Sequence, residues 1–272
     1  MAWQGIDAIR NCLDKFGPKR RCGPFIREYR KLVLDLAKLR QRVAGESDPH
    51  IREFLGYALS KVAISRSQIF QDAFVTYVLR EKQGGFFCDF GSTDGVFMSN
   101  SFMLENHFAW KGICAEPARS WHEALRRNRP GAMIETRCVW SESGQHLTFM
   151  EAPSMELSTL ERFNHADGRS KDRRQATVYE VETISLNDLL RTCNAPSELD
   201  YLSIDTEGSE LDILQKLDFH QYLPRIITVE HNYTSSRDGI LALLTSHGYQ
   251  RVLPEVSLFD DWYLAPGVRL PS

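Results

Sequence analysis

The chain of 272 residues is 42% hydrophobic and 25% charged, which suits one sizeable globular domain with a small appendage. No apolar run reaches the roughly 18 residues of a membrane span, and the start has no signal-peptide pattern, so we expect a cytoplasmic protein. A net charge of −3 excludes a globally basic nucleic-acid binder, so we expect no nucleic-acid partner. The six cysteines show no C-x-x-C spacing, which argues against a disulfide framework or a zinc site.

Residues 1–64 are predicted to form a helical extension. The segment PFIREYRKLVLDLAKLRQRV has apolar residues at three- and four-residue spacing, GESDP interrupts this pattern, and HIREFLGYALSKVA indicates a second, shorter helix. Residues 10–42 carry eleven Lys and Arg against three Asp and Glu. This basic, amphipathic face would suit peripheral contact with a membrane surface or a glycan. The alternative is a solvated face on a docking or dimerising helix, and a dimerising helix would make the chain a homo-oligomer.

Residues 65–272 are predicted to form a second domain, in which strands and helices alternate. The expected strands are GFFCDFG (85–91), GICAEP (112–117), AMIETRCVW (132–140), DYLSID (200–205) and RIITVE (225–230). The expected helices cover 67–82, 98–108, 119–128, 185–192, 208–217 and 238–248. This alternation predicts a parallel sheet with helices on both faces. Two closing strands, at 249–253 and 257–265, should pair antiparallel, and the runs at 146–152 and 176–184 suit a hairpin-like excursion.

Acidic residues follow several of the predicted strands. In an open α/β sheet the ligand binds beyond the carboxyl ends of the strands. Four strand ends carry five carboxylates, namely Asp89, Glu116, Asp205, Glu207 and Glu230. Acids also favour helix N-termini, which accounts for some acids at such positions. The whole set on one rim predicts a functional site there.

The stretch DFGSTDG (89–95) follows the first strand as a glycine-containing turn. Gly91 and Gly95 permit a sharp turn and close backbone approach, and the next helix would offer free N–H groups. The spacing is not the G-x-G-x-x-G that seats a pyrophosphate. Glu116, at the end of the second strand, is placed to accept hydrogen bonds from both hydroxyls of a ribose. Together these features favour an adenosine-type ligand without a pyrophosphate, so S-adenosylmethionine fits better than NAD.

Five segments of the second domain stand in a characteristic order and spacing: SQIFQD, DFGSTDGVFMSN, LENHFAWKGICAEP, YLSIDTEGSELDIL and IITVEHN. In these segments the chain resembles the FkbM-like family of S-adenosylmethionine-dependent methyltransferases. The resemblance implies a Rossmann-like class I methyltransferase fold, with a seven-stranded, mostly parallel sheet whose last strand is antiparallel. It also implies O-methylation, often of sugar or polyketide hydroxyls. Ser92 and Ser203 depart from the residues that the family often has at these positions.

The resemblance also implies a cofactor site. The turn of residues 89–95 would bind S-adenosylmethionine, Glu116 would hold its ribose, and Gln68 would approach its methionine end. Trp140 and Ser141 would lie near the adenine. The full set expected to bind the cofactor is Gln68, Asp89, Gly91, Ser92, Thr93, Asp94, Gly95, Glu116, Trp140 and Ser141.

The predicted catalytic residues lie at two adjacent strand ends: Asp205, Glu207, Glu230 and His231. Methyl transfer to a hydroxyl needs in-line positioning and removal of the hydroxyl proton. The base would be His231, whose ordinary pKa is roughly 6.5, or Asp205, if its neighbours raise its pKa. In an alternative arrangement, Asp205, Glu207 and Glu230 hold a divalent cation, Mg²⁺ or Ca²⁺, that polarises the hydroxyl. The sequence assigns no metal.

The predicted function is S-adenosylmethionine-dependent O-methylation of a hydroxyl on a sugar, a glycan or a glycosylated metabolite. One alternative is an NAD-dependent Rossmann enzyme, which the missing third glycine disfavours. Another is a non-catalytic module that binds a glycan or a membrane surface, which the joint presence of Asp89, Glu116 and Asp205 disfavours. The sequence does not name the acceptor, but residues 152–176 and the N-terminal helices are expected to shape its pocket.

Overall fold

The structure is a computed structural model that describes residues 38, 41, 43–153, 157–165 and 170–271. The chain divides into two compact units, Met1–Ser60 and Lys61–Ser272, whereas the sequence analysis placed a boundary after residue 64. The predicted helix at 24–43 and the basic face of residues 10–42 lie outside the described residues, apart from 38, 41 and 43. Among the described residues, no helix is long and apolar enough to cross a membrane.

The second predicted helix of the N-terminal extension is present as α3 (Pro49–Lys61). Asp48 begins it, because its Oδ1 accepts hydrogen bonds from the backbone N–H groups of His50 (2.8 Å) and Ile51 (3.3 Å). An acidic cap of this kind satisfies N–H groups that have no partner within the helix. The presence of α3 confirms the second, shorter helix that the sequence predicted.

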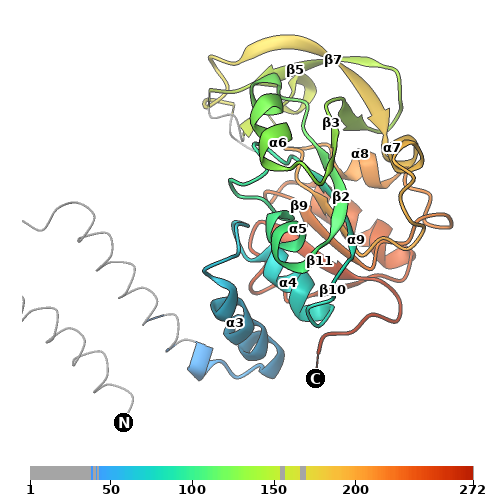
Figure 1. The fold of residues 1–272 in the computed structure, drawn as a ribbon. Coiled ribbons are helices and arrows are strands. Elements are labelled where there is room, and N and C mark those ends of the chain that lie inside the picture. Colours follow the sequence, from blue (N-terminus) through green and yellow to red (C-terminus); the bar gives the residue numbers. More distant parts are fainter. Residues whose placement is uncertain (1–37, 39–40, 42, 154–156, 166–169, 272) are drawn as a thin grey trace, which may run out of the picture. The chain divides into compact units, whose positions relative to one another are not determined.

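The second unit contains a seven-stranded sheet with the order β10-β11-β9-β8-β1-β2-β3 (Figure 1). β1 pairs parallel with β2 and β8, and the parallel pairing extends to β3 and β9. β11 runs antiparallel to both of its neighbours, β9 and β10. The predicted fold class is thus confirmed. The strands are β1 (Phe86–Phe90), β2 (Lys111–Ala115), β3 (Met133–Glu135), β8 (Tyr201–Ile204), β9 (Ile226–Glu230), β10 (Gln250–Val252) and β11 (Asp260–Leu264).

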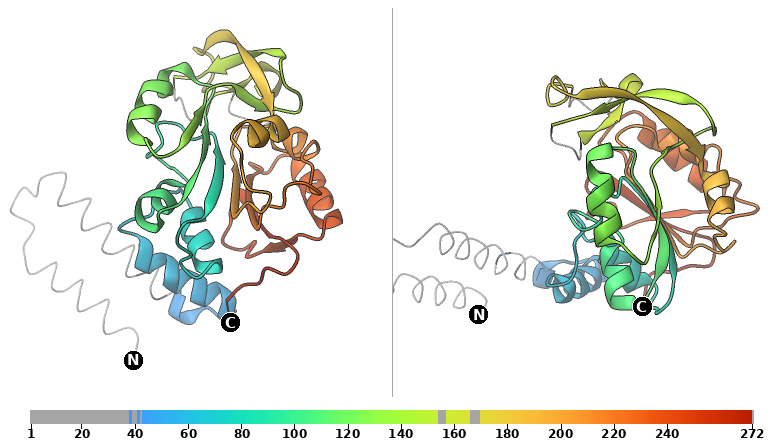
Figure 2. Two further views of the ribbon diagram at one scale, coloured as in Figure 1. Left: turned by 45° about the vertical axis from the view of Figure 1, so that its right-hand side comes forward. Right: turned by 45° about the horizontal axis from the view of Figure 1, so that its top comes forward.

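Helices cover both faces of this sheet, with α5 and α6 on one side and α7 to α9 on the other (Figure 2). A parallel sheet needs such cover because both of its faces are apolar. Ser185 begins α7, since its hydroxyl accepts a hydrogen bond from the N–H of Asp188 (3.1 Å). The helices are α4 (Gln71–Val78), α5 (Phe102–Phe108), η1 (Arg119–Trp121), α6 (His122–Asn128), α7 (Leu186–Thr192), α8 (Glu210–Leu214) and α9 (Ser236–Ser246).

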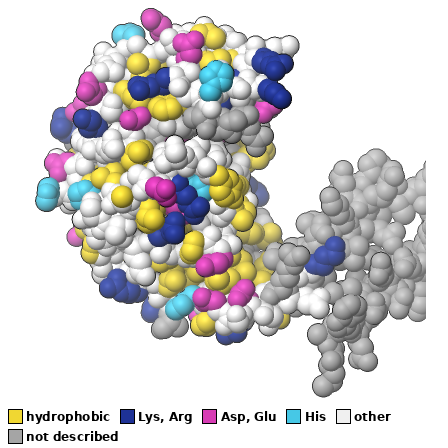
Figure 3. Space-filling view, turned by 180° about the vertical axis from the view of Figure 1, so that it is seen from behind, with side chains coloured by type: hydrophobic (Ala, Val, Ile, Leu, Met, Phe, Trp, Pro, Cys, Tyr) yellow, Lys and Arg dark blue, Asp and Glu magenta, His cyan; other side chains and the backbone are white. Residues whose placement is uncertain are grey.

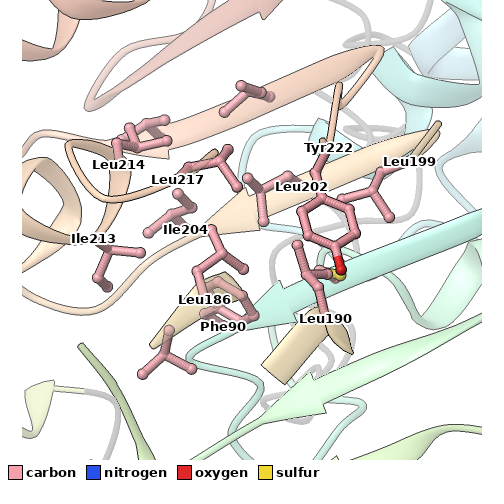
Figure 4. Packing of buried hydrophobic residues seen from close by; sticks show 14 of the residues in the cluster. Phe90, Leu186, Leu190, Leu199, Leu202, Ile204, Ile213, Leu214, Leu217 and Tyr222 are labelled. Carbon is pink, nitrogen blue, oxygen red and sulfur yellow. The ribbon is translucent and has the colours of Figure 1, made fainter. Parts of the chain in front are cut away.

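A large hydrophobic cluster lies between the sheet and helices α7 to α9 (Figure 4). Each central strand contributes alternate residues to it, as the two-residue repeat of a strand requires. The residues that the four central strands contribute are Cys88, Phe90, Ile113, Ala115, Leu202, Ile204, Ile227 and Val229. This packing fixes the four central strands relative to one another, so their carboxyl ends form one rigid rim.

A second, smaller sheet has the order β4-β7-β5-β6 and is seen at the top of Figure 1. Its long strands β5 (His146–Glu151) and β7 (Thr177–Ser185) pair antiparallel, which confirms the predicted hairpin-like excursion. β6 (Thr159–Leu160) pairs with β5, and β4 (Cys138–Trp140) pairs parallel with β7.

The prediction of one strand over 132–140 is wrong. The chain forms β3 in the large sheet and then β4 in the small one. Arg137 turns back on Glu135, with its Nη2 2.7 Å from Oε2 and its backbone N–H 2.9 Å from Oε1. This pair bends the chain between the two strands. The third strand of the large sheet therefore ends at Glu135, not at Trp140.

Three predicted helices are shorter than expected. α4 begins at Gln71 rather than at residue 67, because Asp72 accepts hydrogen bonds from Ser65, Arg66 and Ser67 and holds the preceding residues in a loop. The helices expected at 98–108 and 208–217 begin at residues 102 and 210.

On the face of the molecule in Figure 3, the acidic and basic side chains of the described residues are interspersed rather than segregated.

Candidate active site

A cavity of about 360 Å³ lies at the carboxyl ends of the central strands. Gly91 follows β1, Glu116 follows β2, Asp205 follows β8, and Glu230 ends β9, and all four line the cavity. The small sheet supplies another wall through Phe149 and Leu160, together with Leu157 and Ser158 just before β6. This cavity therefore lies at the predicted position of the site, at the rim of the sheet.

Gly91 occupies a position that only glycine fits. Its φ of 79° is left-handed, and an added Cβ would lie 1.9 Å from the backbone oxygen of Asp205. The cause is strand register, because Phe90 of β1 is paired with Ile204 of β8 and the next residue on each strand follows in the same register. The backbone N–H of Gly91 donates to the carbonyl of Ala115, at 3.0 Å. Close approach of three strand ends thus explains the glycine.

Arg129, at the end of α6, supports the turn from behind. Its guanidinium is fully buried, and its Nη1 donates to the carbonyl of Gly95 (3.1 Å). Its Nη2 donates to the hydroxyl of Ser101 (3.0 Å), which in turn donates to Asp89 (2.5 Å). Its Nε pairs with Glu105 at 2.6 Å. Sequence analysis missed Arg129, because nothing in the local run RRNRP separates a buried arginine from an exposed one.

Four residues of the turn that were predicted to bind the cofactor are absent from the described cavity lining: Asp89, Ser92, Asp94 and Gly95. Their contacts instead hold the turn. Asp94 Oδ1 accepts from the N–H groups of Val96 (2.8 Å) and Phe97 (2.7 Å), and the hydroxyl of Ser92 donates to the carbonyl of Asp89 (2.6 Å). Of the turn residues, Gly91 and Thr93 line the cavity.

Glu116 is buried, lines the cavity, and is anchored by two backbone groups. Its Oε2 accepts from the N–H of Thr93 (2.9 Å) and its Oε1 from the N–H of Ala118 (2.8 Å). Each carboxylate oxygen keeps a further lone pair for a ligand hydroxyl. Burial raises the pKa of Glu116 to about 7, against the two backbone hydrogen bonds, which lower it. The carboxylate is therefore fixed in the cavity wall with acceptor capacity left over, and its contact with a ribose stays a prediction.

Three carboxylates meet on the other side of the cavity: Asp205, Glu207 and Glu230. Among the described residues, each offers an oxygen within 4.8 Å of the others. Ile204 of β8 is paired with Val229 of β9, so the following residues, Asp205 and Glu230, are also neighbours. Burial raises the pKa of Asp205 to about 7, and burial together with the charge of Asp205 raises the pKa of Glu230 well above its usual value. This pair can hold one proton between two carboxyl groups.

His231 does not belong to the described lining of the cavity. Its Nδ1 accepts from the N–H of Tyr233 (3.0 Å), and its Nε2 lies 3.7 Å from Asp261. Asp261 is itself paired with Arg237 (2.8 Å). Of the two candidates for the catalytic base, Asp205 is therefore the one that the structure places in the cavity.

Trp140 and Ser141 also fall outside the cavity lining as described, where Cys138 and Val139 appear instead. Trp140 is buried beside Phe163, with ring centroids 6.0 Å apart. The adenine contact of Trp140 and Ser141 therefore stays a prediction. Gln68 does line the cavity, and its Nε2 lies 2.7 Å from the sulfur of Met98.

Several lining residues were not singled out by the sequence analysis as site residues: Ile69, Met98, Phe149, Leu157, Ser158, Leu160 and Phe259. Asn232, which also lines the cavity, comes two residues after Glu230, so its place beyond a strand end was a usable signal. Leu157, Ser158 and Leu160 lie within residues 152–176, which were expected to shape the pocket. Ile69 and Met98 lie within two of the family segments, SQIFQD and DFGSTDGVFMSN. Phe149 and Phe259 carry no motif, because apolar side chains look alike in a core and in a cavity wall.

The strand order, the antiparallel β11, the glycine turn after β1 and the acid after β2 together define the class of protein. The protein is a class I S-adenosylmethionine-dependent methyltransferase. The residues present fit this cofactor, since Gly91 leaves room at the turn and Glu116 offers hydrogen-bond acceptors for ribose hydroxyls.

The comparison with family models shows the particular family. The methyltransferase FkbM domain matches residues 89–251, which is more than half of the chain, and the chain belongs to this family. The predicted family is thus confirmed, and with it a methyltransferase that uses S-adenosylmethionine. A search of curated proteins found no match.

Solved structures with a similar arrangement include three methyltransferases. A methyltransferase from Geobacter sulfurreducens is 11% identical, with a TM-score of 0.41, and the match covers 84% of this chain and 96% of that one. An O-methyltransferase from Bacillus cereus in complex with SAH is 10% identical, with a TM-score of 0.40 and coverage of 84% and 97%. A precorrin-6y C5,15-methyltransferase from Geobacter metallireducens is 12% identical, with a TM-score of 0.36 and coverage of 66% and 70%. Because these TM-scores are low, we draw no conclusion from the three likenesses.

Proposed function

We propose that this protein is an O-methyltransferase whose acceptor is a hydroxyl of a sugar, a glycan or a glycosylated metabolite. The observation that carries the proposal is the pair Asp205 and Glu230, which lines the cavity and in which burial raises the pKa of Asp205 to about 7. A carboxylate with such a pKa is suited to take a proton from a hydroxyl near neutral pH. When bound, S-adenosylmethionine supplies an electrophilic methyl group on a sulfonium and leaves as a neutral thioether.

The division of work among the residues follows from their positions. Gly91 and Thr93 line the cavity beside Glu116, so this side would hold the adenosine part of the cofactor. Asp205 accepts the acceptor's hydroxyl proton, and Glu230 beside it stabilises the shared proton. The wall of the small sheet excludes water from the reacting groups, which strengthens their electrostatic interactions.

The carboxylates and Asn232 also support a sugar as the acceptor. Glu207 Oε2 lies 3.5 Å from Asn232 Nδ2, so carboxylate and amide groups stand together in the wall. Neighbouring hydroxyls of a sugar can each donate to such acceptors. An acceptor hydroxyl could thus be oriented by its neighbours on the same ring.

Within the same proposal, a divalent cation held by the three carboxylates is the alternative to proton removal by Asp205 alone. The three carboxylates have their oxygens within 4.8 Å of one another, which is the kind of oxygen cluster that Mg²⁺ or Ca²⁺ uses. Activity that disappears with a chelator and returns with Mg²⁺ or Ca²⁺ would favour the cation. Activity that is indifferent to the chelator would favour proton removal by Asp205 alone.

The test begins with calorimetric titration of S-adenosylmethionine, S-adenosylhomocysteine and NAD against the wild type and Glu116→Ala. We expect the first two ligands to bind and the variant to lose this binding. The wild type is then incubated with methyl-labelled cofactor and a panel of free sugars, alkyl glycosides and matched amino sugars, and the product is located by NMR. Methyl groups on nitrogen would overturn the O-methylation proposal, and tight NAD binding would restore the Rossmann dehydrogenase alternative. Binding without turnover on any acceptor would favour a non-catalytic module.

The proposal includes a cytoplasmic location, as the sequence analysis expected. Fractionation of cells that express the full chain with an epitope tag tests it. Recovery with the membrane fraction, released by high salt, would point instead to peripheral attachment.

A further inference from the structure

Arg173 is a buried charge that none of the sequence motifs explains. It lies in the described stretch just before β7, and its side chain is fully buried. Guanidinium stays protonated in proteins, and burying a charge is costly unless it is paired and hydrogen-bonded. The contacts of Arg173 with the described residues therefore indicate what this buried charge does.

The guanidinium connects the cavity wall to a cavity carboxylate. Its Nε donates to the backbone carbonyl of Leu157 (2.6 Å), and its Nη1 lies 3.5 Å from that of Asn164. Its Nη2 donates to Oε2 of Glu207, at 3.2 Å. Leu157 and Glu207 both line the cavity. One side chain thus ties the segment that follows β5 to the loop that follows β8.

Two further contacts join the same two segments. The hydroxyl of Thr159 donates to the backbone carbonyl of Glu207, at 2.7 Å. Gly208 is packed so closely on Phe163 that an added Cβ would lie 2.9 Å from the Phe163 side chain. Glu207 itself has a φ of 57°, a left-handed conformation that is uncommon for a residue with a side chain. Its position is therefore held by the wall segment as well as by β8.

The ion pair between Arg173 and Glu207 also changes the net charge of the site. Asp205, Glu207 and Glu230 bring three carboxyl groups together, and like charges at such distances repel. A bound divalent cation is one way to offset this repulsion, and a cation supplied by the protein is another. Arg173 is such a cation, since it contacts Glu207 from the side of the wall.

We propose that Arg173 is the built-in cation of this acidic cluster. It positions Glu207 and offsets the negative charge that a divalent metal ion would otherwise offset. Arg173 is a positioning residue in this proposal, because it acts through Glu207. The proposal rests on the proposed function only where it assigns the proton transfer to Asp205 and Glu230.

The first test measures metal binding and needs no acceptor. Mn²⁺ and Mg²⁺ are titrated calorimetrically into the full chain, as wild type, Arg173→Gln, Arg173→Lys and the double variant Arg173→Gln/Glu207→Gln. We expect no saturable binding to the wild type or to Arg173→Lys, binding to Arg173→Gln, and its loss in the double variant. A wild type that binds a cation, with binding abolished by Glu207→Gln, would overturn the proposal. So would a folded Arg173→Gln that binds none.

The second test uses the reaction. We expect Arg173→Gln to lower kcat by about 100-fold, because misplacement of a catalytic group by about 1 Å has an effect of this size. We expect the midpoint of the pH–rate profile to move to higher pH, since loss of a nearby positive charge raises the pKa of carboxyl groups. Arg173→Lys should return the midpoint toward that of the wild type. An unchanged midpoint in a folded Arg173→Gln would show a merely structural role.

Circular dichroism controls for folding in both tests. If Arg173→Gln does not fold, cation binding to the wild type, Glu207→Gln and Arg173→Lys still tests the proposal. Wild type and Arg173→Lys that both fail to bind a cation support the proposal, whereas saturable binding to the wild type that Glu207→Gln removes contradicts it. Failure to find a methyl acceptor would weaken the proposed function and leave the metal titration unaffected, so the two failures are distinguishable.

Discussion

The two sides of the cavity are built by different means. On the β1–β2 side, Gly91, Thr93 and the backbone-anchored carboxylate of Glu116 line the cavity. The fully buried Arg129 supports the turn on this side through a backbone carbonyl and a hydroxyl. On the β8–β9 side, carboxyl side chains form the site, and the fully buried Arg173 supports it through Glu207. The first side should therefore be sensitive to added volume at Gly91, whereas the second side should be sensitive chiefly to changes of charge.

Gly91→Ala should give the largest effect on the β1–β2 side. The left-handed φ costs a residue with a Cβ roughly 1–2 kcal/mol, and here the Cβ would also lie 1.9 Å from the backbone of Asp205. We expect loss of cofactor binding by calorimetry and a marked fall in the free energy of unfolding in urea. Gly144→Ala is the matched control, because Gly144 has a φ of 75° and no atom within 4 Å of an added Cβ. Equal losses in the two variants would show that close approach at Gly91 is unimportant.

Asp205→Asn tests the β8–β9 side. Loss of a general base lowers rates by about 10²- to 10⁴-fold, so we expect such a fall in kcat with little change in the Kd for S-adenosylmethionine. His231→Gln should lower kcat much less, because His231 lies against Asp261 and outside the described cavity lining. A rate loss in His231→Gln as large as in Asp205→Asn would restore His231 as the base.

Glu116→Gln should weaken cofactor binding by about 10- to 100-fold, since a hydrogen bond to a charged group is worth about 1.5–3 kcal/mol. The pKa of Glu116 is raised to about 7 by burial, and ribose hydroxyls donate better to the ionised form. Cofactor affinity of the wild type should therefore rise from pH 6 to pH 8, and calorimetry of the variant should show a smaller rise. Asp94→Asn, at a residue outside the described lining, should keep the wild-type pH dependence.

The buried carboxyls should also make stability depend on pH. Burial raises the pKa of Asp205 from 3.8 to about 7 and that of Glu230 well above 4.5. A group whose pKa is higher in the folded state stabilises the fold below its unfolded pKa, and this contribution is lost as pH rises through the folded pKa. The free energy of unfolding should thus fall by about 1–3 kcal/mol between pH 5 and pH 8 in denaturant titrations. Glu230→Gln should flatten this curve, whereas Glu53→Gln, at an exposed position, should leave it unchanged.

The position of the site could be predicted from the sequence because it depends on strand ends. Apolar runs that end in Asp205 and Glu230 predict buried parallel strands, and parallel strands place their carboxyl ends on one rim. Strand alternation also disfavours a shared role for Glu230 and His231. Glu230 and His231 are adjacent, and successive residues of an extended chain point to opposite sides, so both could not readily face the cavity.

The supporting groups could not be predicted in the same way. Arg129 and Arg173 are fully buried, yet each stands in a polar run that is typical of the surface. The break between β3 and β4 depends on the pair between Arg137 and Glu135, which transfers Trp140 to the small sheet. Each of these features depends on a partner that the fold brings close.

The sequence by itself determined the family, the parallel sheet, the glycine turn and the set of acids at the strand ends, because these follow from local periodicity and from motifs with fixed spacing. Only the tertiary structure decided which acids face the cavity and which arginines hold them. Side-chain direction at a strand end depends on register with the neighbouring strands, and a charge stays buried only where distant segments supply its partners.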